Sequence, residues 1–266
     1  PTYPPGIRTC VRKEWSAQPM RLHDTLSDCG NVFFRWRSYT PLLLVPLMYL
    51  ERQTLQHPMD PLHNAVYEAV CVAVVFVGML IRAATIGHIA KGTSGRNTKR
   101  QVASALNETG LYSIVRNPLY VGNYFIMLGV TLMAQSWAIA VINSFLFAAA
   151  YIPIILTEEE FLTGKFGERY LAYANRVPCF IPNPRLWRPA DLPFSVRMVL
   201  RREHDTWMSS ILGLVLFGLY RESMQRGALV LSHKWVSIGL VSLVVWLVFK
   251  AVKLGTGLLQ ERAQPA

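Results

Sequence analysis

This 266-residue chain is strongly apolar, with 52% hydrophobic and only 16% charged residues. Lys and Arg outnumber Asp and Glu by 27 to 16, which alone would also suit a nucleic-acid partner. The apolar residues, however, are bunched into long runs, which excludes an ordinary soluble domain and predicts an integral membrane protein with no nucleic-acid partner.

The apolar runs predict an all-α, polytopic bundle of about five to six transmembrane helices, since about 20 apolar residues cross the hydrocarbon layer. The expected spans are 64–87, 119–135, 137–156, 206–220 and 235–252. A further run, 41–50, is short for a span, and it either extends back through Val32–Trp36 or only dips into the membrane. Because 119–135 and 137–156 almost touch, they are expected to form a tight antiparallel hairpin.

Positive charge predicts the orientation of these spans. With six spans, 22 Lys and Arg lie in the segments on one side, four lie on the other side, and Arg82 lies inside a span. The positive-inside rule then places both ends of the sequence and the two long loops in the cytoplasm. In chain order, the sequence predicts a cytoplasmic or interfacial segment at 1–40, a membrane core at 41–205 and a C-terminal transmembrane hairpin at 206–266.

Other signals are weak. No cleavable signal peptide is expected, because residues 1–30 lack a continuous apolar core. The four cysteines and six histidines are scattered, so they predict no zinc site, disulfide framework or other metal site.

Several charged residues invite a functional interpretation. Glu68 and Arg82 lie inside a span, near enough to its ends to extend to water, so a structural role is favoured over a functional one. Cations in the loops suit an anionic lipid headgroup, although ordinary positive-inside loops look the same. The candidate headgroup contacts are Arg96, Lys99, Arg185 and Arg188.

A helix is expected to begin at Pro118, because proline suits the first turn. Asn117 just before it is expected to cap the free N–H groups of that helix with its side chain. Arg116 and Tyr120 would then lie where the helix meets water. Gly122, one turn into the helix, is expected to allow close packing of a neighbouring helix.

The hairpin is predicted to leave the membrane at an acidic run, Glu158-Glu159-Glu160. Residues 161–173 then predict an amphipathic surface helix, and Val177-Pro178 predicts a turn after it. Aromatic rings beside carboxylates are able to enclose a cationic, partly apolar ligand.

Two blocks together resemble the superfamily of isoprenylcysteine carboxyl methyltransferases and phospholipid methyltransferases. Residues 109–122 are similar to the family pattern G-x-Y…R-H-P-x-Y-x-G. Residues 158–182 are similar to E-E-x-x-L…F-G-x-x-Y-x-x-Y-x-x-x-V-P. The resemblance keeps order and spacing over about 64–184, and two blocks on either side of a hairpin are far more specific than either block alone.

The resemblance implies S-adenosylmethionine as methyl donor on the cytoplasmic side, and a membrane lipid or lipidated acceptor that enters from the bilayer. Arg116, Glu158 and Glu159 are the expected catalytic residues: a carboxylate would accept a proton or offset the charge of the cofactor, and the guanidinium would steady an anionic acceptor. The cofactor-binding residues that it implies are Tyr112, Arg116, Asn117, Pro118, Tyr120, Gly122, Glu158, Glu159, Tyr170, Tyr173, Val177 and Pro178.

One departure leaves alternatives open. The family's usual histidine is Asn117 here, which can form hydrogen bonds but does not titrate near neutral pH. A sterol-type membrane reductase that uses NADPH is one alternative, although Asn123 replaces the acid of its H-x-N-Y-x-G-D pattern. A non-catalytic lipid-binding protein is the other. The sequence predicts neither the acceptor nor the oligomeric state.

Overall fold

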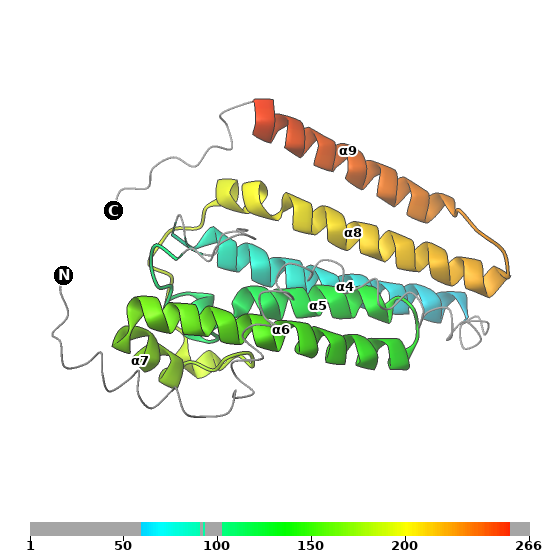
Figure 1. Ribbon diagram of the computed structural model, residues 1–266. Coiled ribbons are helices and arrows are strands. Elements are labelled where there is room, and N and C mark those ends of the chain that lie inside the picture. Colours follow the sequence, from blue (N-terminus) through cyan, green and yellow to red (C-terminus); the bar gives the residue numbers. More distant parts are fainter. Residues whose placement is uncertain (1–59, 91–92, 94–102, 256–266) are drawn as a thin grey trace.

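The computed structural model describes residues 60–90, 93 and 103–255 (Figure 1). Within these residues the protein is all-helical, which confirms the predicted fold class. The expected segment 1–40 and the apolar run 41–50 lie outside the described residues. The helices are α4 (Pro61–Gly87), α5 (Pro118–Leu132), α6 (Trp137–Phe166), α7 (Glu168–Arg176), α8 (Val196–Arg226) and α9 (His233–Gly255), with short 3-10 turns η3 (Leu111–Ser113) and η4 (Pro184–Leu186).

Three of the described helices, α4, α6 and α9, are long and apolar enough to cross a membrane. Helix α5 is apolar but has only 15 residues, and α8 has 31 residues but carries charges toward both of its ends. A helical membrane bundle is thus confirmed, while the number of spans stays a prediction. Helix α8 is also continuous through residues 205 and 206, where the core was predicted to give way to a C-terminal hairpin.

The expected hairpin is formed by α5 and α6, joined by a four-residue turn. Helix α4 packs closely on α5 at positions occupied by glycine. A Cβ atom at Gly122 would lie 2.5 Å from Cγ of Arg82, and one at Gly78 would lie 2.6 Å from the carbonyl oxygen of Gly122. Glycine therefore permits this backbone approach, as expected for Gly122.

Helix α8 packs on α4, and α9 packs on α8, so the helices form a row in the order α6, α5, α4, α8, α9 (Figure 1). The end of α4, the beginnings of α5 and α8 and the end of α6 lie together with α7, which we call the site end. The α5–α6 and α8–α9 turns lie at the opposite end of the row, which we call the far end (Figure 1).

The acidic run does not end the hairpin. Helix α6 continues through Glu158-Glu159-Glu160 to Phe166, and a separate helix, α7, begins at Glu168. The prediction of one surface helix over 161–173 is therefore wrong. No residue near 157–163 breaks the helix, whereas Gly167 has a φ of 56°, which glycine adopts readily and other residues rarely adopt.

Candidate functional site

Two loops lie against each other at the site end, and their backbones are joined by hydrogen bonds. The loop before α5 donates from the N–H of Arg116 to the carbonyl of Pro178, over 2.9 Å. In the same loop, the N–H of Gly110 donates to the carbonyl of Arg188, over 3.0 Å. The segment after α7 thus covers the loop that holds the first motif block.

Arg116 joins the two motif blocks through an ion pair. Its Nε donates to Oε1 of Glu159 over 2.8 Å, and the two side chains are only 15% and 22% exposed. Its Nη1 also donates to the carbonyls of Ala174 and Val177 at the end of α7. Burial alone would lower the pKa of Arg116, but the carboxylate of Glu159 outweighs burial and raises that pKa, so the guanidinium stays charged.

A second hydrogen bond joins the same two blocks, and its acceptor, Glu158, is the residue next to Glu159. The hydroxyl of Tyr120, in the first turn of α5, donates to Oε1 of Glu158 over 2.6 Å. The ring of Tyr120 lies edge-on to that of Tyr151 at 5.0 Å, within an aromatic cluster that includes Phe180. Glu158 and Glu159 therefore each receive a hydrogen bond from the first motif block, 38 and 43 residues earlier.

The two family tyrosines of α7 form the buried side of that helix. Tyr170 and Tyr173 are each 3% exposed, and the hydroxyl of Tyr173 donates to the carbonyl of Tyr112 over 2.8 Å. Burial raises the pKa of both tyrosines, and for Tyr170 the nearby Glu159 raises the pKa further. Both hydroxyls therefore remain neutral donors at physiological pH.

Asn117 occupies the cap position of α5, but its side chain does not cap the helix, which corrects the prediction. Its Nδ2 instead donates to the carbonyl of Cys179 over 3.1 Å, and only its backbone carbonyl accepts from the first turn. The side chain therefore ties the covering segment to the site. This requires an N–H donor, which a neutral histidine also offers, and no titration.

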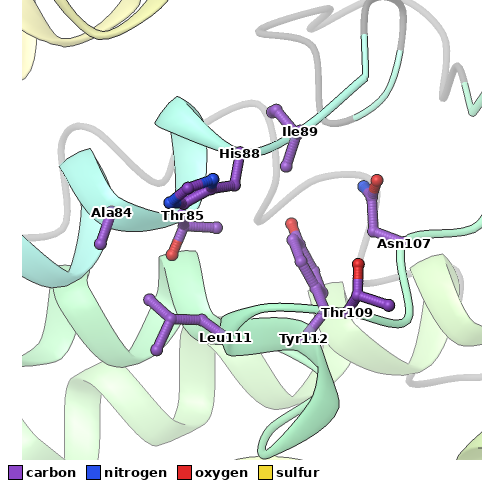
Figure 2. A pocket seen from close by; sticks show the side chains of 8 residues that line it. All are labelled: Ala84, Thr85, His88, Ile89, Asn107, Thr109, Leu111 and Tyr112. Atoms are coloured by element: carbon purple, nitrogen blue, oxygen red, sulfur yellow. The ribbon is translucent and has the colours of Figure 1, made fainter. Parts of the chain in front are cut away.

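A small hollow lies beside this network, between the end of α4 and the loop before α5 (Figure 2). Tyr112 was the one lining residue predicted from the sequence, and its hydroxyl points into the hollow (Figure 2). His88, whose Nδ1 lies 2.8 Å from the carbonyl of Leu192, was missed because it follows a span without any motif. The hollow is lined by Ala84, Thr85, His88, Ile89, Asn107, Thr109, Leu111 and Tyr112.

The other residues predicted for the site lie in different parts of the structure. Pro118 is buried at the first turn of α5, and Gly122 serves the contact with α4. Arg185 and Arg188 are exposed on the covering segment. Arg96 and Lys99 lie outside the described residues. The structure thus gathers Arg116, Asn117, Tyr120, Glu158, Glu159, Tyr170, Tyr173, Val177 and Pro178 at the site end.

Arg82 was expected to extend from its span to water, and this is wrong. Its side chain is 11% exposed and forms two hydrogen bonds with the carboxylate of Glu203 on α8. Glu68 likewise is 10% exposed and pairs with Arg221 and Lys234 at the far end. Nothing in the sequence identified these partners.

The geometry defines a membrane helical hairpin whose two polar motif blocks meet at one end, and this part of the chain matches a known family. Residues 66–169 match the model of the phospholipid methyltransferase family. The resemblance predicted from the motifs, to the superfamily of phospholipid and isoprenylcysteine carboxyl methyltransferases, is thereby confirmed. Over these residues the chain is similar to phospholipid methyltransferases.

Individual relatives match over less than half of this chain. The cobalt-zinc-cadmium resistance protein CzcN of Cupriavidus metallidurans is 38% identical over 115 residues, covering 42% of this chain and 50% of the relative. The nickel-cobalt-cadmium resistance protein NccN of Alcaligenes xylosoxydans xylosoxydans is 36% identical over 45% of this chain and 54% of its own length. The protein-S-isoprenylcysteine O-methyltransferase of Schizosaccharomyces pombe is 27% identical over 44% of this chain and 50% of its own length. The chain thus spans about half the length of these relatives, and solved structures give no match.

Proposed function

We propose that this protein transfers a methyl group from S-adenosylmethionine to a membrane lipid or a lipidated acceptor. The observation that carries the proposal is the ion pair between Arg116 and Glu159, because it joins the two family blocks at one place. The pair between Tyr120 and Glu158 supports the same assignment. We propose that the site end faces the cytoplasm, in keeping with the charge distribution.

The charges at the site suit this cofactor. One guanidinium and two carboxylates, from Arg116, Glu158 and Glu159, leave a local excess of one negative charge. S-adenosylmethionine, when bound, supplies a methyl group on a positively charged sulfonium, which such an excess would stabilise. Tyr112 and the polar residues of the hollow beside it are suited to the polar parts of the cofactor, while the buried Tyr173 holds α7 against the loop before α5.

The residues of this chain would act chiefly by positioning. Methyl transfer is an in-line displacement, so the acceptor atom must be held about 3 Å from the methyl carbon. A carboxylate or phosphate oxygen is already ionised and needs no base, whereas an amine acceptor would first lose a proton to Glu158 or to water. Arg185 and Arg188, exposed on the covering segment, are proposed contacts for an anionic headgroup.

Transfer of labelled methyl from S-adenosylmethionine tests the proposal, using purified protein with a total membrane lipid extract and with prenylated peptides. Label in a lipid band or a peptide is expected, with a matching gain in mass. Binding of S-adenosylhomocysteine without labelling would favour a non-catalytic protein, and binding of NADPH instead would favour a reductase.

A matched pair of variants separates the site from the surface. Arg116→Ala is expected to abolish transfer while the protein still folds. Arg169→Ala removes a similar pair, in which Nε of Arg169 lies 2.8 Å from Glu108 but Arg169 is 67% exposed. This variant is expected to keep full activity, because exposed pairs contribute little. Full activity in Arg116→Ala would show that the site is wrongly assigned.

A further inference from the structure

A chain of buried and half-buried polar side chains crosses the bundle beside the candidate site. Its first link is a bidentate ion pair between α4 and α8: Nε and Nη2 of Arg82 donate to the two carboxylate oxygens of Glu203, over 2.7 and 2.8 Å. Glu203 is 1% exposed. It lies beyond residues 66–169, so the family resemblance assigns it nothing.

The second link runs through α5 to α6. Nη1 of Arg82 donates to Oδ1 of Asn123 over 2.6 Å, and Nδ2 of Asn123 donates to the hydroxyl of Tyr151 over 3.2 Å. A guanidinium only donates, so it fixes the orientation of the amide. The amide N–H₂ of Asn123 must then face Tyr151.

The third link reaches the site itself. The ring of Tyr151 lies edge-on to that of Tyr120 at 5.0 Å, and the hydroxyl of Tyr120 donates to Glu158. Because Tyr151 accepts from Asn123, its own O–H is directed elsewhere as a donor. The two hydrogen bonds from Arg82 to Tyr151 polarise each other in a low-dielectric interior, and the ring contact then carries the position of Tyr151 to Tyr120.

The hydrogen bonds therefore run in one direction from Arg82 through Asn123 to Tyr151, and the ring contact joins Tyr151 to Tyr120. A bidentate ion pair inside a membrane bundle is costly to desolvate, and charged residues inside membrane helices commonly mark functional positions. Here the geometry that the pair defines is the orientation of Asn123, and through it that of Tyr151.

Resting on the proposed methyl transfer, we propose that Glu203, Arg82 and Asn123 are positioning residues of the site, acting through Tyr151 on Tyr120 and Glu158. Helix α8 is then part of the active enzyme and more than an additional anchor in the membrane. The chain sets the alignment of the reacting groups, so its loss lowers kcat more than it raises the KM of the cofactor.

A double-mutant cycle tests this, using Glu203→Gln, Tyr151→Phe and the combination of both in the full-length protein. Glutamine would place an N–H₂ group against the donors of Arg82 and so release Asn123. Each single variant is expected to lower kcat about tenfold, with the KM of S-adenosylmethionine changed less than about twofold. Because both act through one chain, the double variant is expected to lose no more than about tenfold.

A matched control lies at the far end of the same two helices. Glu68→Gln also disrupts a buried ion pair between α4 and α8, with Arg221, and it is expected to lower stability without changing kcat per folded molecule. Asn123→Ala removes the central link while leaving the ion pair with Glu203 in place, so it provides the test if Glu203→Gln does not fold.

The outcomes are distinct. A wild-type protein that transfers methyl while Glu203→Gln and Asn123→Ala keep their kcat would overturn the inference alone. A double variant that loses about a hundredfold would show independent effects and would overturn the chain as well. A wild-type protein that transfers no methyl to any acceptor would overturn the proposed function, and the inference with it.

Discussion

Helices α4 and α8 are joined twice by a buried arginine–carboxylate pair, once at each end. At the site end Arg82 of α4 pairs with Glu203 of α8, and at the far end the polarity is reversed, with Glu68 of α4 and Arg221 of α8. Both arginines are largely or fully buried. The same chemistry therefore serves two regions, and the difference between them lies in the neighbours of each pair.

At the far end the neighbours complete a clamp. Glu68 also pairs with Lys234, at the beginning of α9, so one carboxylate joins three helices. The Nε of Arg221 is buried and has no hydrogen-bond partner among the described residues. This incomplete satisfaction is a cost in free energy that the interhelical contact must offset.

At the site end, by contrast, the neighbouring residues continue the hydrogen bonds of the ion pair toward the candidate site. The donors of Arg82 that remain after pairing reach Asn123 and, at 3.4 Å, Thr206. From Asn123 the hydrogen bonds continue to Tyr151, beside the motif residues. The two ion pairs alone do not distinguish a structural clamp from a positioning device. The residue bound next to each pair does, because it is Lys234 at the far end and Asn123 at the site end.

The largest expected effect comes from breaking the far-end clamp. Glu68→Ala leaves the fully buried Arg221 without a carboxylate, so we expect a loss of about 3–5 kcal/mol in the free energy of unfolding. Methyl transfer per folded molecule should stay within about twofold of wild type. Unfolding titrations in detergent micelles, with activity normalised to the folded fraction, measure both. A large loss of normalised activity would erase the distinction between the two ends.

A pair of conservative exchanges sharpens the comparison with a smaller effect. Lysine keeps the charge of arginine but loses the planar fork that binds two oxygens at once. We expect Arg82→Lys to lower kcat about tenfold, or about 1.4 kcal/mol in the barrier, because Asn123 and Glu203 can no longer be held together. Arg221→Lys should leave kcat unchanged. Equal effects of the two exchanges on kcat would count against a special role for the site end.

The contacts between the two motif blocks were predictable, because the family resemblance implied that both blocks line one pocket. Two short blocks on either side of a hairpin predicted that Arg116 and Tyr120 would meet the residues of the acidic run, and the structure pairs them with Glu159 and Glu158. The hairpin followed from hydropathy alone. The end of α6 did not, since the acidic run suggested an exit from the membrane while only Gly167 has the backbone conformation that ends the helix.

The polar chain could not be predicted, for a physical reason. Arg82 and Glu203 are 121 residues apart in the sequence. Neither helix periodicity nor a motif relates positions on two helices that are so far apart along the chain. The charge in the span gave a signal, because a charge at that depth needs a partner. The sequence suggested that the side chain of Arg82 extends to water, whereas in the folded bundle α8 supplies the carboxylate of Glu203. Tertiary packing decides between these solutions.

Asn117 offers a smaller test within the site end. Its side chain holds the covering segment through one hydrogen bond to the carbonyl of Cys179, worth about 1 kcal/mol. We expect Asn117→Ala to lower transfer about fivefold, while Asn117→His, which restores an N–H donor, should stay within about twofold. Initial rates over a range of pH check this. A new pH dependence in the histidine variant would indicate that the position acts as a base and not as a tether.

The smallest expected effect concerns the buried tyrosines of α7. Burial raises the pKa of Tyr173 above its ordinary value of about 10, so the folded protein keeps this proton at a pH where the unfolded chain loses it. The resulting stability is fully present below about pH 10 and is lost as pH rises further. Tyr173→Phe removes this contribution and the bond to Tyr112, so it should cost about 1 kcal/mol at pH 8. Its difference from wild type should shrink between pH 10 and 11, because only the wild type then has a proton to lose; a constant difference would show that Tyr173 ionises as readily in the folded protein as in the unfolded chain.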